Sequence, residues 1–282
     1  MAGLLLFRGL AAPPAAGPPL ARGPFGRPHP GNILVMPQQK DYPTAAPFVP
    51  RDADLTEVAR AARQCHGCDL YENATQTVFG EGAADADVVL IGEQPGDAED
   101  RQGKPFVGPA GKLLDRALSD AGIDRGNSYV TNSVKHFRWK FAPGGGKRRI
   151  HQKPEAWQLA ACRPWLDAEL ARLKPRVLVV LGATAGQALF GPSFRVTKSR
   201  GEVLPWRSPG GPGGGAGGGA GGGADGTEFT VVPTVHPSSV IRTDDAGRDA
   251  AYAAFVADLR VAARQLPGRG GDRAAGGSGG GR

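Results

Sequence analysis

Four short apolar runs, each followed by a helical pattern, constrain the fold of this 282-residue chain. The runs are ADVVLIGE (86–93), SYVTNSVK (128–135), RVLVVLG (176–182) and FTVVPTVH (229–236). Continuous β-branched character is typical of strands that are buried on both faces. Helical patterns occupy 54–65, 108–122, 155–173, 183–191 and 249–266. The alternation predicts an α/β fold with three α/β/α layers around a central four-stranded parallel sheet.

Low-complexity segments flank and interrupt this pattern. The N-terminal segment 1–45 is rich in Pro, Gly and Ala, 208–226 reads SPGGPGGGAGGGAGGGADG, and 268–282 is glycine-rich. Such composition cannot bury enough apolar surface to form a core. We therefore expect disordered tails at both ends and one folded domain, 46–267, with a flexible insertion at 208–226. Translation that starts at Met36 is an alternative for the N-terminus.

The net charge and the cysteine content indicate what kind of partner and what kind of cofactor to expect. The formal net charge of +7 favours a polyanionic partner. No apolar run approaches the length of a membrane span, so we expect a cytoplasmic monomer without a membrane partner. Three cysteines without a convincing export signal favour metal or redox use over a disulfide framework.

Polar motifs follow the predicted strands, at the edge where parallel sheets bind their ligands. The loop GEQPGDAEDRQGKPFVGPAG (92–111) lacks the glycine spacing of nucleotide-binding loops, and its acids Glu93 and Asp97 would repel phosphate. With Phe106 further along, the loop suits an acid, base or ion-pairing group beside a flat aromatic ligand. The motif HPSSVIR (236–242) can present hydroxyls and backbone N–H groups to an anion, although a histidine that caps a turn is the alternative.

The cysteines suggest a metal centre. Cys65 and Cys68 form a C-x-x-C pair, and Cys162 lies far along the chain. Three thiolates are one short of the usual four ligands of an iron–sulfur cluster or a structural zinc. His136, at the end of the second predicted strand, is the candidate for the fourth ligand. A redox pair is disfavoured because the C-x-x-C precedes the first strand, and buried free cysteines are the other alternative.

A basic segment, GGGKRRIHQKP (144–154), places three cations before a single His151. Clustered cations on a flexible loop predict contact with phosphate. A neutral imidazole is also a good nucleophile, and neighbouring cations would disfavour its protonation. On the residues alone, a phosphate-binding loop is the favoured interpretation.

Taken together, GEQPG…GKPFVGPAG and HPSSVIR resemble the first and second motifs of the uracil-DNA glycosylase superfamily, specifically its iron–sulfur branch. The resemblance extends over residues 54–264. KRRIH and the insertion before it resemble the X-type uracil-DNA glycosylases, in which a loop histidine bonds covalently to DNA after uracil is removed. This chain departs from ordinary iron–sulfur members, which carry a Cys where it has His136 and a shorter link to the cysteine matching Cys162.

The resemblance implies a role for each residue in recognising a flipped-out uracil. Phe106 would stack on the base, Asn132 would read O4 and N3–H, and Gln94 would add contacts. Asp97 is a weaker candidate for this pocket. Uracil-containing DNA, preferably single-stranded, is the implied partner. Residues implied to grip its phosphates are Lys147, Arg148, Arg149, Ser238, Ser239 and Arg242.

Three residues would carry the chemistry. His236 would stabilise the departing uracil anion, Glu93 would stabilise the sugar cation, and His151 would trap the abasic sugar in a single turnover. The implied cofactor is a [4Fe–4S] cluster, with zinc as the alternative, on Cys65, Cys68, His136 and Cys162. Two other functions stay open: a turnover glycosylase with water directed by Glu93, and a non-catalytic nucleic-acid binder. Repair and lesion marking are both open as the cellular use.

Overall fold

A computed structural model of the chain describes residues 44–144, 146–208 and 226–266. The predicted C-terminal tail, residues 1–43 of the predicted N-terminal tail and residues 209–225 of the predicted insertion lie outside the described residues. Among the helices of the described part, none has the length and apolar character needed to cross a bilayer.

The central sheet contains the four predicted strands in parallel. Its order is β1-β3-β2-β6-β8-β7, and β3, β2, β6 and β8 are parallel neighbours. The strands are β1 (Glu81–Gly82), β2 (Val88–Gly92), β3 (Ser128–Asn132), β6 (Val177–Leu181), β7 (Leu204–Arg207) and β8 (Glu228–Thr234). The four-stranded parallel core is thereby confirmed. The sequence did not reveal the antiparallel edge strands, which are short: β1 is exposed and β7 is only partly buried.

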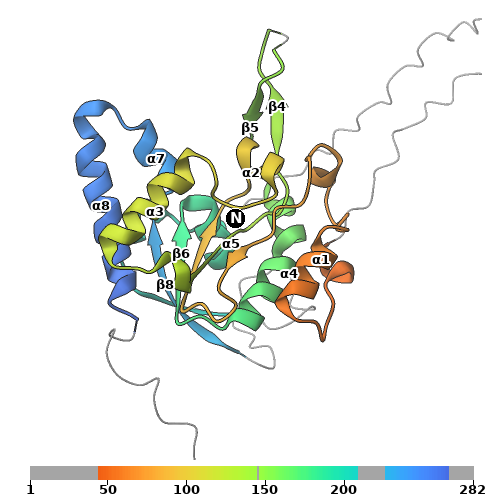
Figure 1. The fold of residues 1–282 in the computed structure, drawn as a ribbon, viewed down its shortest axis with the longest axis horizontal. Coiled ribbons are helices and arrows are strands. Elements are labelled where there is room, and N and C mark those ends of the chain that lie inside the picture. Colours follow the sequence, from red (N-terminus) through yellow and green to blue (C-terminus); the bar gives the residue numbers. More distant parts are fainter. Residues whose placement is uncertain (1–43, 145, 209–225, 267–282) are drawn as a thin grey trace, which may run out of the picture. The chain divides into compact units, whose positions relative to one another are not determined.

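Helices cover both faces of this sheet, which confirms the three layers (Figure 1). They are α1 (Leu55–Ala62), α2 (Asp97–Gln102), α3 (Pro109–Ala121), α4 (Ala156–Leu173), α5 (Ala183–Phe190), α6 (Val196–Ser199), α7 (Pro237–Arg242) and α8 (Asp245–Ala263). Short 3₁₀ turns are η1 (Ala46–Phe48), η2 (Asp69–Glu72) and η3 (Arg125–Asn127).

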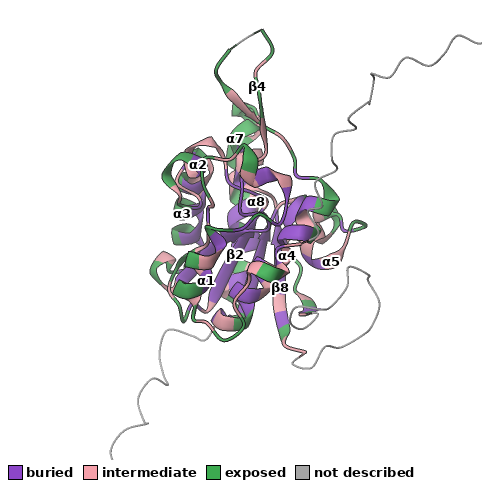
Figure 2. Cartoon of the chain, turned by 90° about the vertical axis from the view of Figure 1, so that its right-hand side faces the viewer, coloured by how far each residue is buried: buried purple, intermediate pink, exposed green. Residues whose placement is uncertain are grey.

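Alternate residues of the buried strands face opposite helix layers, as the period of a strand requires. Val88 and Leu90 of β2 pack in a core with α3 and α8. Val89 and Ile91 pack in a second core with α4 and α5. Figure 2 shows the resulting band of buried residues through the middle of the fold. The polar residues that follow each strand therefore meet at one edge of the sheet.

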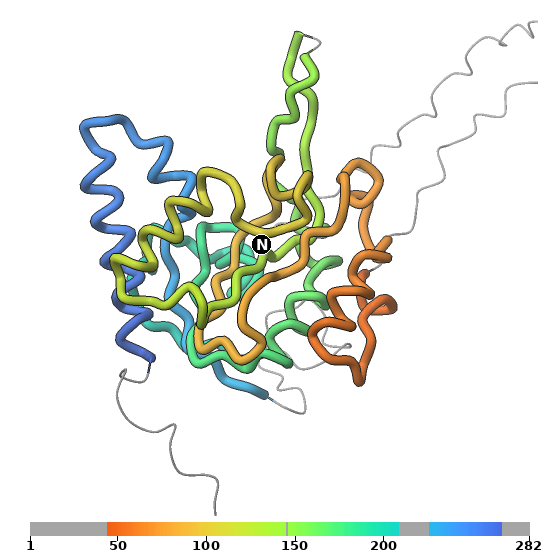
Figure 3. The backbone as a smooth tube through the Cα atoms, in the orientation of Figure 1, coloured from red at the N-terminus to blue at the C-terminus, as the bar shows by residue number. Residues whose placement is uncertain are grey.

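A β-hairpin projects beyond that edge (Figures 1 and 3). It consists of β4 (Trp139–Phe141) and β5 (Arg149–His151), which pair antiparallel with Trp139 opposite His151 and Phe141 opposite Arg149. The expectation of a flexible loop is therefore wrong for Arg149–His151, because these residues form ladder hydrogen bonds with the preceding segment. The hairpin fixes which side chains share a face with His151.

A buried ion pair joins the end of β3 to α4. Lys135 and Glu169 have side chains that are 1% and 0% exposed, and Lys135 Nζ lies 2.6 Å from Glu169 Oε2. The same carboxylate accepts hydrogen bonds from Tyr129 and Thr131, and from the backbone of Gly80. Lys135 also donates to the backbone carbonyl of Asn132 at 2.8 Å. Because these side chains are buried away from water, removal of one of them would leave another without a hydrogen-bond partner.

We predict that Lys135→Met lowers the free energy of unfolding by about 3–5 kcal/mol, because it leaves the Glu169 carboxylate buried without its cation. Urea denaturation measures this loss. Removal of both charges in Lys135→Met/Glu169→Leu should recover part of it. The exposed pair of Lys104 and Glu81 is the matched control, and Lys104→Met should change stability by less than about 1 kcal/mol. A Lys135→Met effect as small as this control would contradict the prediction.

Candidate active site

The carboxyl ends of β2 and β3 bring an amide and an aromatic ring together. Gly92 and Asn132 are register partners at these strand ends. A Cβ added to Gly92 would lie 2.3 Å from Asn132 Oδ1 and 2.7 Å from Phe106 Cζ. Only glycine leaves room for both side chains here, so the strand end is shaped to bring Asn132 and Phe106 close together.

Phe106 is held in a strained conformation opposite a histidine. Its φ of 55° is left-handed, which is uncommon for an aromatic residue. In α3, a Cβ on Gly111 would lie 1.6 Å from the carbonyl oxygen of Phe106, so this conformation requires a glycine there. The Phe106 ring is 6.2 Å from the His236 ring, with 27° between their planes. Strain of this kind is often retained where it orients a binding group.

His236 has a defined tautomer. Its Nδ1 accepts a hydrogen bond from the Ser238 backbone N–H at 3.2 Å and lies 2.8 Å from Ser238 Oγ. Arg242 in turn donates to Ser238 Oγ at 3.0 Å. Because Nδ1 is an acceptor, the proton of the neutral ring resides on Nε2, which makes Nε2 a hydrogen-bond donor. Burial, with the charges of His151 and Arg242, lowers the pKa of His236 to about 4.

The two predicted serines of this motif already have partners within it. Ser238 links Arg242 to His236, and Ser239 Oγ donates to the His236 carbonyl at 2.7 Å. These bonds fix the start of α7. Arg242 is exposed, so its guanidinium is accessible to an anion.

His151 faces Glu93 across the edge of the sheet. Its Nε2 lies 3.3 Å from Glu93 Oε1, with the two side chains 48% and 21% exposed. Burial lowers the pKa of His151, the charge of Arg242 lowers it further, and Glu93 opposes both. The ring is therefore neutral at physiological pH. A cation that disfavours its protonation is Arg242 of α7, which is distant in sequence from the basic segment.

Arg149 holds the hairpin in place through two acidic side chains, Asp97 and Asp100. Its guanidinium is 9% exposed and forms ion pairs with Asp97 Oδ1 and, at 2.6 Å, with Asp100 Oδ2. It also donates to Thr75 Oγ1. In this structure Arg149 therefore binds carboxylates where the sequence predicted phosphate, and Asp97 holds the hairpin where it was a weak candidate for the base pocket. Burial raises the pKa of Asp97, but hydrogen bonds from Arg101 and Arg149 outweigh it and lower the pKa overall.

Gln94 also fastens the hairpin. Its Nε2 donates to the carbonyls of Arg138 and Gln152, and its Oε1 accepts from the Arg138 backbone N–H. Arg138 and Gln152 flank the two hairpin strands. The side-chain amide is thus engaged away from the base pocket for which it was predicted, and it sets the base of the hairpin beside Glu93.

Lys147 and Arg148 are exposed near the tip of the hairpin. Within the described ranges, neither forms an ion pair with an acidic side chain. Of the three clustered cations, these two are therefore the ones that remain accessible to phosphate.

The three cysteines lie in one apolar cluster between α1 and α4. All are buried and free, and they pack with Val58, Ala62 and Trp165. The backbone N–H of Lys135 donates to Cys162 Sγ at 3.3 Å. Burial raises the pKa of Cys68 to about 11 and raises that of Cys162. Among the described residues, no three His, Cys, Asp or Glu side chains stand in a metal-binding arrangement.

The chemistry around this cluster nevertheless fits a metal centre. Thr77 donates its hydroxyl proton to the Ala62 carbonyl, so the His136 Nε2 at 2.9 Å is the donor to Thr77 Oγ1. His136 Nδ1 is then unprotonated, as in metal-bound histidines whose other nitrogen donates to an oxygen. Burial lowers the pKa of His136 to about 4, which keeps the ring neutral. Within the described part of the chain, the buried indole N–H of Trp165 in the same cluster has no hydrogen-bond partner.

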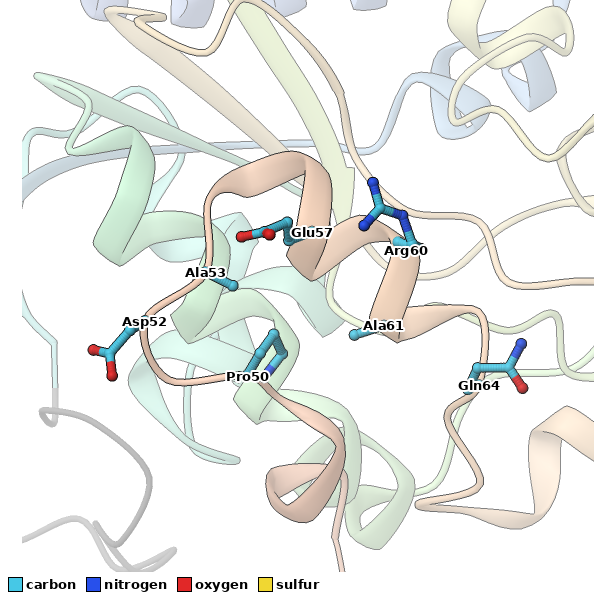
Figure 4. Close-up of a pocket in the computed structure, with 7 residues that line it drawn as sticks. All are labelled: Pro50, Asp52, Ala53, Glu57, Arg60, Ala61 and Gln64. Atoms are coloured by element: carbon cyan, nitrogen blue, oxygen red, sulfur yellow. The ribbon is translucent and has the colours of Figure 1, made fainter.

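Two surface hollows lie mostly outside the site described above. One, of about 560 Å³, contains none of the predicted site residues and is drawn in Figure 4. It is lined by Pro50, Asp52, Ala53, Glu57, Arg60, Ala61 and Gln64. The other, of about 540 Å³, shares only Phe106 with the site and is flanked by Lys104, Lys112 and Arg125.

The carboxyl ends of the parallel strands bring together an amide, a strained aromatic ring and the neutral His236, and the hairpin places His151 beside Glu93. The chain belongs to the uracil DNA glycosylase superfamily, whose family model matches residues 79–260. The resemblance of the sequence motifs to this superfamily is therefore confirmed.

Named relatives support the assignment. A type-4 uracil-DNA glycosylase of Thermotoga maritima is 34% identical over 193 residues, covering 68% of this chain and 85% of the relative. One of Sulfurisphaera tokodaii is 30% identical over 192 residues, covering 66% and 76%. One of Pyrobaculum aerophilum is 34% identical over 150 residues, covering 53% and 71%.

We predict that the neutral His236 makes the fold sensitive to acid. Its pKa is about 4 in the fold, against about 6.5 in an unfolded chain, so the unfolded state binds the proton first. This contribution to stability is complete above pH 6.5 and declines as the pH falls from 6.5 toward 4. Urea denaturation across this pH range should show that the free energy of unfolding declines less steeply for His236→Gln than for the wild type. Equal slopes for both proteins would contradict the assignment.

Proposed function

We propose that the protein excises uracil from DNA, preferably single-stranded DNA, and then captures the abasic sugar on His151. The observation that carries this proposal is the pair of His151 and Glu93, a neutral imidazole 3.3 Å from a carboxylate at the sheet edge. A conventional glycosylase that turns over requires no such histidine, whereas a nucleophile requires an unprotonated ring nitrogen and a group that orients it.

The base pocket follows from the residues around Gly92. Asn132 offers one amide donor and one acceptor, which match the O4 and N3–H of uracil. Phe106 offers a ring face for stacking, and it lies nearly parallel to His236. Flipped-out bases are read in this way, by hydrogen bonds at the base edge and stacking on its face.

The chemical steps can be assigned to individual groups. The bond between C1′ and the uracil nitrogen breaks, and its electron pair leaves with uracil. His236 donates its Nε2–H toward the uracil oxygen on which negative charge develops. The resulting sugar cation accepts the lone pair of the unprotonated His151 nitrogen and forms a C–N bond. Glu93 balances the positive charge on the ring and can accept its remaining N–H proton.

We predict that the wild-type protein forms a denaturant-resistant complex with a uracil-containing single-stranded oligonucleotide, and that His151→Ala does not. His151→Ala should release abasic product instead, because water can reach the sugar cation. A denaturing gel after incubation measures both species. Ile150→Ala, a neighbour on the opposite face of the hairpin, should keep the complex. Wild-type capture should persist below pH 6.5, because the pKa of His151 is lowered.

Three other results of this assay would reject the capture step. Free abasic product with repeated turnovers by the wild type would identify a conventional glycosylase in which Glu93 directs water. A resistant complex that survives in His151→Ala would assign the bond to another residue. Uracil that stays intact under all conditions would leave only a non-catalytic nucleic-acid binder.

We propose further that Cys65, Cys68, Cys162 and His136 hold a [4Fe–4S] cluster. The three buried thiols share one apolar cluster, and His136 has an unprotonated Nδ1, which supports this ligand set. When bound, the cluster would cross-link the segment after α1, the end of β3 and helix α4, and so contribute to folding.

We predict that protein purified anaerobically contains iron and sulfide and absorbs in the visible range. His136→Cys should retain the iron, since thiolate is the usual ligand, whereas His136→Ala should lower it. Iron and sulfide analysis with visible absorbance measures this independently of any activity. Wild-type protein with zinc in place of iron would reject the cluster while keeping the ligands, and metal-free protein would reject both.

A further inference from the structure

An exposed aromatic side chain shares a hairpin face with the proposed nucleophile. Directly paired residues of an antiparallel ladder lie on the same face, as do alternate residues of one strand. Trp139 pairs with His151, and Phe141 pairs with Arg149, so these four side chains share one face. Phe141 is 59% exposed, the most exposed of the large apolar side chains in the described part of the chain.

The ring of Phe141 is firmly supported although it is exposed. It packs edge-on against Trp139, with ring centroids 4.7 Å apart and 81° between the planes. The Trp139 indole N–H donates to the Asn73 carbonyl at 2.9 Å, and the Arg149 guanidinium lies 5.3 Å from the Trp139 ring. Arg149 is itself fixed by the buried Asp100. A ring supported in this way loses little conformational entropy when it binds a ligand.

Three exposed cations lie on the same hairpin as this ring: Lys140 in β4, and Lys147 and Arg148 just before Arg149 in the sequence. Within the described residues none of them is paired with an acid. An exposed aromatic ring among unpaired cations matches single-stranded nucleic acid, whose bases stack on rings and whose phosphates bind cations. The surrounding charge argues against a basic or neutral apolar protein partner.

We propose that Phe141 stacks on a nucleobase next to the uracil site and so holds the strand across the hairpin. This inference rests on the proposed function, since His151 defines where the reacting sugar lies. Phe141 is two residues from the pair of Trp139 and His151, about 7 Å along the strand. That distance brings the ring within reach of the adjacent nucleotide and keeps it away from the target base, which Phe106 serves.

The test uses the full-length protein and single-stranded oligonucleotides that carry the fluorescent base 2-aminopurine on one side of uracil or the other. Binding should change the fluorescence on one flank, Phe141→Ala should abolish that change, and Phe141→Tyr should retain it. Phe141→Ala should also raise the half-saturating concentration for uracil excision by about 5- to 100-fold, as expected for one lost base stack. Phe141→Ala should change this half-saturating concentration more than it changes the maximal single-turnover rate of excision.

Val203→Ala is the matched control, because Val203 is also exposed and apolar but lies outside the hairpin. Unchanged fluorescence on both flanks, or a Phe141→Ala protein that binds as tightly as Val203→Ala, would overturn the stacking role. A wild-type protein that leaves uracil intact would reject the proposed function alone. The fluorescence comparison would then still decide the stacking role, because it requires binding and no excision.

Discussion

The ion cluster of Arg149, Asp97 and Asp100 is the interaction on which the site depends. A three-residue strand pair is too small to hold its own position. Asp100 is fully buried and Arg149 nearly so, and separating them would leave the buried Asp100 carboxylate without its cation. The hairpin is therefore bound to α2, which begins four residues after Glu93. This fixed distance lets a side chain on a projecting hairpin face a carboxylate at the sheet edge.

Strand β3 connects the cysteine cluster to the proposed base pocket. Within four residues of its end, Asn132 reaches the pocket, the Lys135 backbone donates to Cys162, and the Lys135 ammonium bonds the Asn132 carbonyl. Glu169, two helical turns after Cys162 on α4, completes this connection. A change at the thiols therefore has a short path of buried hydrogen bonds to the residue that would read the base.

The sequence predicted features that are set locally and missed those set by distant partners. Continuous apolar runs identified the parallel strands, and the strand ends drew attention to Asn132 and His236, which lie at one edge of the sheet in the fold. The hairpin was missed because its strands have three residues each and carry Lys and Arg. Arg149 and Gln94 look like binding residues in the sequence. Their partners are Asp100 and the backbone of Arg138, which no local pattern connects to them.

The difference between local and distant partners also applies to the protonation of His151, the proposed nucleophile. From the sequence, the cations beside His151 were expected to disfavour its protonation. In the fold, burial and Arg242 lower its pKa, and Arg242 lowers that of His236 as well. One cation from α7 thus favours the neutral form of both the leaving-group donor and the proposed nucleophile. Among the hairpin cations, Arg149 anchors the hairpin, and Lys147 and Arg148 are the ones proposed to contact DNA. If His151 captures the sugar, a glycosylase scaffold would gain this step from one anchored hairpin, with its proposed base pocket unchanged.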